Sequence, residues 1–182
     1  LQISNLSFGF TNTWWDLDAS PFANKDVDPA CIRLLGHGDD IRVTHNRFEH
    51  VNLPVRLVVV GDGKTIDRVR ITDNVIRYTD HGAMQLLDGS SWGQEYPTTQ
   101  LLDVKVLRNK LQYIGMRPTS WGQGHAIDIL CAQTCEVAGN VLNKLYGAGI
   151  FVYGGKRSAA RTDRPLSRIL IHHNQVTDSL LN

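Results

Sequence analysis

The chain has 182 residues, of which 42% are hydrophobic and 20% are charged, and its formal net charge is +1. This composition is that of a globular domain with its own core and excludes a disordered tail. Because basic and acidic residues are interspersed, neither a nucleic acid nor a membrane surface is an expected partner. No apolar stretch approaches the length of a transmembrane span, and no signal peptide opens the sequence.

Short alternating apolar segments that end at an asparagine recur along the chain. The five segments are IRVTHN, VRITDN, VKVLRN, CEVAGN and ILIHHN, and they end at Asn46, Asn74, Asn109, Asn140 and Asn174. The asparagines are 28, 35, 31 and 34 residues apart. Because side chains alternate between the two faces of a strand, both apolar residues of each segment point the same way. In the earlier segment ISNLSF, Leu6 takes the place of the asparagine, so we expect a strand pair there without the amide.

A second strand follows each asparagine, and its apolar residue lies two places further on, at Phe48, Ile76, Leu111, Leu142 or Val176. Repeats of this length, built only from short strands and corners, predict a solenoid in which each turn buries its apolar face against its neighbours. We therefore predict an all-β parallel β-helix of about five to six turns. Asparagine suits the corner because it tolerates the left-handed backbone conformation, and stacked amides can form hydrogen bonds from turn to turn.

The repeats resemble those of right-handed parallel β-helix proteins, the superfamily of pectate lyases, polygalacturonases and related bacterial glycoside hydrolases. The resemblance covers essentially the whole chain, and residues 124–156, GHAIDILCAQTCEVAGNVLNKLYGAGIFVYGGK, are similar to repeats of bacterial carbohydrate-active proteins. It implies a right-handed solenoid forming one domain over residues 1–182, and a secreted or periplasmic bacterial enzyme. Neither end shows the cap that a solenoid core needs. We expect a piece of a longer protein whose export signal lies outside this sequence.

A third strand completes each repeat, in the segments ACIRLL, PVRLVV, GAMQLL, HAIDIL and AGIFVY. Aligned on their apolar residues, these strands form a first sheet with one outward-facing row: Arg33, Arg56, Gln85, Asp128 and Phe151. Insertions flank this sheet and avoid the asparagine corner, at residues 12–29, 61–67, 88–102, 115–124 and 154–167. Long loops on one side of a rigid scaffold are where function gathers. The pattern predicts a groove along the solenoid axis that suits a linear polysaccharide.

Asp128 is the leading catalytic candidate, because a shielded carboxylate in the middle of the outward row would have a raised pKa and could act as an acid. His125 begins the same strand and His81 begins the strand beside it. Turns of the solenoid stack about 4.8 Å apart, so these groups can converge on one site. Glu95 and Asp88 are loop carboxylates that could supply a catalytic partner. Each of these side chains could instead be an ordinary solvated surface residue.

Substrate binding is expected from the same row and from the loops beside it. Arg33 and Arg56 could bind a uronate carboxylate, and Gln85, Phe151 and Tyr153 line the same strands. All four tryptophans fall in the insertions: Trp14, Trp15, Trp92 and Trp121. An indole ring offers a flat apolar face with a polar edge, which matches a sugar ring. The same rings could instead anchor long loops on the solenoid.

Two enzymatic functions fit these residues. A glycoside hydrolase needs two carboxyl groups, about 5–5.5 Å apart for retention or about 6.5–9.5 Å apart for inversion. Asp128 would be one of them, and Glu95 or Asp88 the other. A polysaccharide lyase needs an arginine or histidine base acting on a uronate polymer, with a charge neutraliser such as calcium.

The hydrolase is our first expectation, because the outward row holds a single acid where a calcium site needs several. We therefore expect no cofactor and no metal for a hydrolase, with calcium possible only for a lyase. A non-catalytic adhesin or stalk segment is the third possibility, but uneven tryptophan-bearing loops on one side favour an enzyme. We expect a monomer.

The chain contains three cysteines, of which Cys131 and Cys135 are predicted to face inward on either side of a corner. Small buried thiols are the expected arrangement, and a local disulfide is the alternative. The spacing of the cysteines and the absence of a matching histidine pair argue against a zinc site.

Overall fold

The computed structural model describes residues 1–11, 30–88, 99–116, 124–154 and 167–179, and every regular element in these ranges is a β-strand. Sheet A contains β1 (Gln2–Ser4), β4 (Gly38–Thr44), β7 (Thr65–Thr72), β10 (Gln100–Leu107), β13 (Ala132–Ala138) and β16 (Ser167–His172). Sheet B contains β2 (Ser7–Gly9), β5 (Arg47–Val51), β8 (Val75–Thr79), β11 (Lys110–Ile114), β14 (Val141–Leu145) and β17 (Gln175–Ser179). Sheet C contains β3 (Ala30–Gly36), β6 (Leu53–Val59), β9 (Met84–Leu87), β12 (Ile127–Leu130) and β15 (Ile150–Tyr153).

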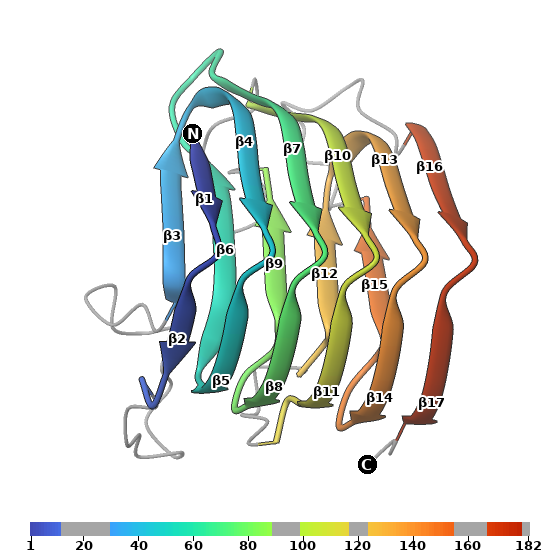
Figure 1. The fold of residues 1–182 in the computed structure, drawn as a ribbon. Helices are drawn as coiled ribbons and strands as arrows, with labels where there is room; N and C mark the ends of the chain where they lie inside the picture. Colours follow the sequence, from blue (N-terminus) through green and yellow to red (C-terminus); the bar gives the residue numbers. More distant parts are fainter. Residues whose placement is uncertain (12–29, 89–98, 117–123, 155–166, 180–182) are drawn as a thin grey trace, which may run out of the picture.

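The chain winds through the three sheets in a fixed order, and each turn lies beside the next. After β4 in sheet A the chain enters β5 in sheet B and β6 in sheet C, then returns to sheet A at β7, which pairs with β4 in parallel. The same advance by one strand occurs in sheets B and C. In Figure 1 sheets A and B face the viewer, one above the other, and sheet C lies behind them. The predicted parallel β-helix is confirmed. In the described ranges, no helix has the length and hydropathy needed to cross a membrane.

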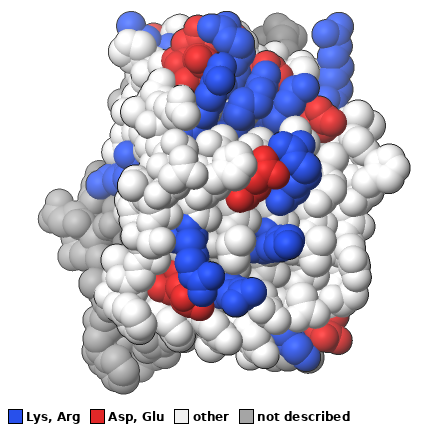
Figure 2. All heavy atoms as spheres, viewed as in Figure 1, with Lys and Arg blue, Asp and Glu red and all other residues white. Residues whose placement is uncertain are grey.

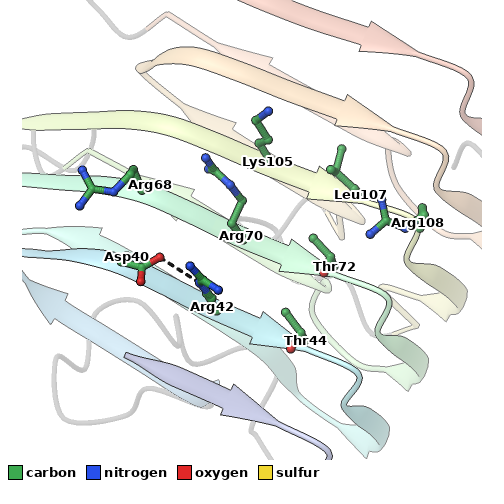
Figure 3. A pocket seen from close by; sticks show the side chains of 9 residues that line it. All are labelled: Asp40, Arg42, Thr44, Arg68, Arg70, Thr72, Lys105, Leu107 and Arg108. Carbon is green, nitrogen blue, oxygen red and sulfur yellow. Dashed lines mark hydrogen bonds and ion pairs between the residues drawn. The ribbon is translucent and has the colours of Figure 1, made fainter.

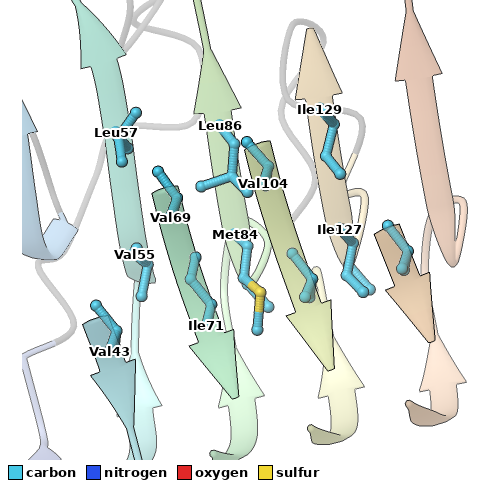
Figure 4. Packing of buried hydrophobic residues seen from close by; sticks show 14 of the residues in the cluster. Val43, Val55, Leu57, Val69, Ile71, Met84, Leu86, Val104, Ile127 and Ile129 are labelled. Carbon is cyan, nitrogen blue, oxygen red and sulfur yellow. The ribbon is translucent and has the colours of Figure 1, made fainter. Parts of the chain in front are cut away.

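The core lies between the sheets and is built from the inward-facing apolar rows. Val69 and Val104 of sheet A and Met84, Leu86 and Ile127 of sheet C meet in this interior, and all five are fully buried. Figure 4 shows their side chains packing across the space between the two sheets. Burying one such side chain contributes about 1.5–3 kcal/mol, so each turn is stabilised mainly by the turns on either side of it.

The asparagine ladder runs along the corner between sheets A and B. At Asn74, Oδ1 accepts hydrogen bonds from the backbone N–H of Asn46 (2.9 Å) and from its Nδ2 (3.1 Å). Nδ2 of Asn74 donates to Asn109 Oδ1 and to the Val43 carbonyl, each at 2.9 Å. The same pattern continues to Asn140 and Asn174. At the first turn the backbone N–H of Leu6 donates to Asn46 Oδ1 at 3.0 Å, so that turn joins the ladder without an amide, as predicted.

The left-handed residue at this corner is the one before each ladder asparagine, which corrects the conformational role expected for asparagine. Positive φ angles of 52–64° occur at Asn5, His45, Asp73, Arg108, Gly139 and His173. The ladder asparagines therefore serve as hydrogen-bonding groups. Two further columns of left-handed residues recur in the turns, one including Asp40, Arg68, Asp103 and Thr134, and the other including His50, Tyr78 and Tyr113.

The insertion expected at residues 61–67 is shorter than predicted. Strand β7 begins at Thr65, so only a tight turn separates it from β6, closed by a hydrogen bond from the Lys64 N–H to the Gly61 carbonyl at 3.1 Å. The apolar alternation of β7 extends further toward its start than the sequence pattern indicated, because Ile66 is also an inward-facing core residue.

The cysteines form no disulfide. All three are free thiols, and Cys131 and Cys135 are buried as expected. Burial raises the pKa of the Cys135 thiol to about 12, so this side chain is an inert core residue.

Candidate functional site

Sheet C carries the predicted row of outward-facing side chains. Its backbone register places Arg33 beside Arg56, Arg56 beside Gln85, Gln85 beside Asp128 and Asp128 beside Phe151. Adjacent strands lie about 4.8 Å apart, so the row follows the solenoid axis. The alignment of the five strands derived from the sequence is therefore confirmed residue by residue.

A second, apolar row runs beside the polar one, and sequence reasoning identified only its last member, Tyr153. Two residues further along each strand, the register aligns Leu35, Val58, Leu87, Leu130 and Tyr153. The signal for it was present where apolar residues follow one another without alternation, as in LVVV at residues 57–60 and LL at residues 86–87, because a strand buried on one side alone should alternate. The outward face of sheet C thus presents one polar and one apolar row side by side.

The middle of this outward face is sheltered from solvent. Arg56 is only 6% exposed and Leu87 only 1% exposed, although both lie on the outward side. Arg33 and Leu35, at one end of the same rows, are exposed. An outward side chain on an uncovered sheet would be solvated, so β6 and β9 lie in a part of the face that is enclosed.

Asp128 occupies this sheltered region with an unusual environment for a carboxylate. Its Oδ1 atom is inaccessible to solvent and has no hydrogen-bond partner among the described residues. Loss of hydration disfavours the charged form, so burial raises the pKa of Asp128 to about 7. The shielding anticipated from the position of Asp128 in the sequence is thus present, and the carboxyl holds its proton over much of the acidic to neutral range.

His125 lies on the same turn as Asp128, and its ring contacts neighbouring residues of sheet C and the turn beside it. Its ring stacks on Phe151 with a centroid separation of 4.4 Å and an interplanar angle of 15°. The backbone N–H of Ala148 donates to Nδ1 of His125 at 3.2 Å. Burial lowers the pKa of His125, so the ring is neutral at pH 7. Because Nδ1 accepts a hydrogen bond, the proton of the neutral ring lies on Nε2.

His81 and His125 are brought onto adjacent turns by close backbone packing. A Cβ atom at Gly82 would lie 2.6 Å from the carbonyl oxygen of His125, so only glycine allows these turns to stack at this distance. Nε2 of His81 lies 3.3 Å from the side-chain nitrogen of Gln85, which connects His81 to the polar row. The structure therefore gathers His81, Gln85, Asp128 and His125 in one region of sheet C.

The remaining predicted site residues divide into two groups. Trp14, Trp15, Trp92, Trp121 and Glu95 lie outside the described residues. Asp88, expected on a loop, directly follows β9 and is 1% exposed, with its backbone N–H donating to the Leu130 carbonyl at 3.2 Å. Its role as a carboxylate partner stays a prediction.

Among the described residues, no three histidine, cysteine, aspartate or glutamate side chains gather as a metal site would require. A surface hollow of about 600 Å³ lies on the outward face of sheet A, away from Asp128. Comparison with protein-family models, with curated proteins and with solved structures gave no match. The candidate site is therefore argued from its own geometry.

Proposed function

We propose that this protein is a carbohydrate-active enzyme that binds a polysaccharide along the outward face of sheet C and hydrolyses a glycosidic bond. The observation that carries this proposal is the enclosed Oδ1 of Asp128 and the resulting pKa of about 7. A carboxyl group that keeps its proton near neutral pH can transfer it to a departing glycosidic oxygen. Asp128 is accordingly the general acid.

The reaction needs one further group. As the Asp128 proton moves to the bridging oxygen, the bond from that oxygen to the anomeric carbon breaks, and either water or a second carboxylate attacks the anomeric carbon. The polar row of sheet C holds one acid, so the second carboxylate is proposed to be Glu95 or Asp88. His125, on the same turn as the acid and stacked on Phe151, is proposed to contact the sugar beside Asp128.

The two rows of sheet C suit a sugar chain because a pyranose ring has both hydroxyl groups and apolar C–H faces. Gln85 offers an amide group in the polar row, while Leu130 and Tyr153 offer apolar contact in the neighbouring row. Aromatic side chains bind sugar faces through such contacts. Trp14, Trp15, Trp92 and Trp121 are proposed to add further contacts of this kind.

We also propose that the solenoid is right-handed and that the chain is a secreted or periplasmic bacterial member of the pectate-lyase-like superfamily. Three features support this: the three-sheet turn, the asparagine ladder between sheets A and B, and insertions that flank sheet C. Each of these features agrees with the resemblance to this superfamily described from the sequence.

A polysaccharide lyase is the second candidate, favoured by Arg33 and Arg56 side by side on the polar row. A guanidinium group could neutralise a uronate carboxylate there. The lyase is less well supported because Nδ1 of His125 already accepts a hydrogen bond, so this histidine is not positioned as the base. In a lyase, an arginine would therefore have to remove the proton from the uronate substrate.

The test is to incubate the protein with neutral and uronate polysaccharides while following reducing ends and the ultraviolet absorbance of unsaturated products. We expect reducing ends without the absorbance. Asp128→Asn should lower kcat at least about 100-fold, the usual contribution of a general acid. Asp178→Asn, which alters an exposed carboxylate on β17, is the control and should leave kcat unchanged. Unsaturated products would support the lyase, and the absence of any product from every polymer would support a non-catalytic stalk.

A further inference from the structure

The outward face of sheet A carries a row of cations that the candidate site on sheet C does not use. The register aligns Arg42 of β4, Arg70 of β7 and Lys105 of β10, one residue per turn. These three side chains line the hollow of about 600 Å³, and Figure 3 shows them projecting from neighbouring strands. In Figure 2, lysine and arginine side chains gather over this part of the molecule with carboxylates among them. The row follows the solenoid axis with one positive charge about every 4.8 Å.

Arg42 and Lys105 are each paired with a carboxylate, but both retain N–H groups that can bind a ligand. Nε of Arg42 donates to Asp40 Oδ1 at 2.9 Å, and its two terminal nitrogens have no partner among the described residues. Nζ of Lys105 lies 3.2 Å from Glu136 Oε2, an ion pair that uses one of its three N–H groups. The side chains of Arg42 and Lys105 are 54% and 38% exposed. These groups are therefore held in place and can still bind an anion.

Arg70, the middle cation of the row, is less exposed than the other two and is held by hydrogen bonds. Its NH1 group donates to the backbone carbonyls of Val69 (2.9 Å) and Asp103 (2.7 Å), and NH2 donates to Asp103 Oδ2. With its side chain only 27% exposed, Arg70 is a fixed positive charge in the floor of the hollow. Thr44 and Thr72 line the hollow beside the row and add hydroxyl groups.

We propose that this face is a second binding site, for a linear acidic polysaccharide that carries uronate groups. Charge density separates this ligand from a nucleic acid. Duplex DNA carries a negative charge about every 1.7 Å and a single strand about every 3.4 Å, whereas the row offers one cation about every 4.8 Å. Asp40 and Glu136, interleaved with the row, would repel closely spaced phosphates.

The same mixture of groups suits a sugar chain. Carboxylates and threonine hydroxyls can accept hydrogen bonds from sugar hydroxyl groups. Arg42 and Lys105 lie two turns apart, one on each side of Arg70, and each can bind a carboxylate of the same sugar chain. The inference goes beyond the hydrolase proposal, because sheets A and C are different faces of the solenoid. Its failure would leave the role of Asp128 untouched.

Binding of the purified protein to immobilised alginate, a linear uronate polymer, tests the site by biolayer interferometry, with dextran as the neutral polymer. We expect binding to alginate only, weakening as salt is raised from about 50 to 200 mM. Arg42→Gln and Lys105→Gln should each weaken binding about three- to five-fold, as expected for exposed charge contacts. Asp40→Asn should strengthen it about two-fold, because it removes a competing carboxylate. Both glutamine substitutions leave the backbone hydrogen bonds of Arg70 intact.

Arg47→Gln is the matched control, because Arg47 on β5 of sheet B is 51% exposed and paired with Glu49 at 2.9 Å. It should leave alginate binding unchanged. An equal loss for Arg47→Gln would mean that only net charge matters, and would overturn the proposal. So would a wild-type protein that ignores alginate or binds single-stranded oligonucleotides as tightly. Loss of binding in Arg33→Gln with no loss in Arg42→Gln would move the site to sheet C and equally refute the inference.

Discussion

At the scale of single residues, Asp128 is a buried carboxyl group whose ionisation makes the stability of the fold depend on pH. Its carboxyl has a folded-state pKa of about 7 because burial disfavours the charged form, whereas the ordinary value is 3.8. The folded state therefore binds the proton more tightly than the unfolded chain does. This contribution to stability is fully present below about pH 4 and is lost as the pH rises through about 7.

We predict that Asp128→Asn stabilises the protein at pH 8 and changes little at pH 4. An amide cannot ionise, so the variant avoids the cost of a buried charge. One pKa unit corresponds to about 1.4 kcal/mol, and after relaxation of the site we expect a gain in unfolding free energy of about 1–3 kcal/mol at pH 8. Urea unfolding at both pH values measures it. An equal effect at pH 4 and pH 8 would show that Asp128 is ionised normally in the folded state.

At the scale of elements, strands β4, β7, β10, β13 and β16 of sheet A each contain a left-handed residue that bends the chain. In β13 this residue is Thr134, with φ of 60°, and it is exposed. The equivalent residues in β4, β7 and β10 are Asp40, Arg68 and Asp103. A β-branched residue is disfavoured in this conformation, at a cost of roughly 1–2 kcal/mol. The neighbouring strands impose the bend because each turn must follow the one beneath it.

Thr134→Gly should therefore increase the free energy of unfolding by about 0.5–1 kcal/mol, since glycine adopts positive φ without strain. Thr44→Gly is the control, because Thr44 lies in β4 and is not among the left-handed residues. That substitution should destabilise by about 0.5–1 kcal/mol. Thermal or urea denaturation of both variants gives the comparison. If both glycines destabilise, the left-handed residue carries no strain.

Left-handed residues that recur at one position in successive turns also carry a stack of rings beside sheet B. Phe10, His50, Tyr78 and Tyr113 have positive φ, and successive ring centroids lie 4.8–5.2 Å apart with nearly parallel planes. Offset aromatic pairs contribute about 0.5–1.5 kcal/mol each. The stack offsets part of the backbone strain at these positions, which explains why aromatic residues occur where glycine would be expected.

At the scale of the whole molecule, the asparagine ladder connects turn to turn from Asn46 to Asn174. Each amide from Asn46 to Asn140 is bonded to the turns on both sides, so removing one leaves buried groups of its neighbours without partners. In Asn109→Ala the backbone N–H and Nδ2 of Asn74 would both lose their acceptor. Each unsatisfied buried group costs about 1–3 kcal/mol.

We predict that Asn109→Ala lowers the free energy of unfolding by about 2–4 kcal/mol. Because each turn of a solenoid contacts only its neighbours, hydrogen exchange should accelerate most in β7, β10 and β13. Asn143→Ala removes an amide from β14 whose Nδ2 donates to Thr177 Oγ1 at 2.7 Å in an exposed position, and should change stability by less than about 0.5 kcal/mol. Uniform acceleration across the whole chain would show that the turns unfold as one unit.

The sequence by itself determined the repeat, the ladder and the order of side chains on sheet C. These follow from two periods, the alternation of a strand and the length of a turn, and both can be counted along the chain. The row from Arg33 to Phe151 was predictable because inward apolar neighbours fix which residue faces out. The second row was missed because alternation breaks down where both faces of a strand are buried, as at Leu87.

Only the tertiary structure decided the environment of those residues. Burial of Arg56 and Asp88 and the tautomer of His125 depend on atoms from distant parts of the chain, which no local pattern specifies. The left-handed residues were hidden for the same reason, because packing between turns imposes a conformation that Thr134 or Tyr78 would not choose alone. The cation row on sheet A was already present in the sequence, because Arg42, Arg70 and Lys105 each lie four residues before a ladder asparagine. The structure added the hollow that they line and their ion pairs. Sequence periodicity determines which residues are neighbours, and the stacking of the turns determines their burial, their hydrogen bonds and their backbone conformation.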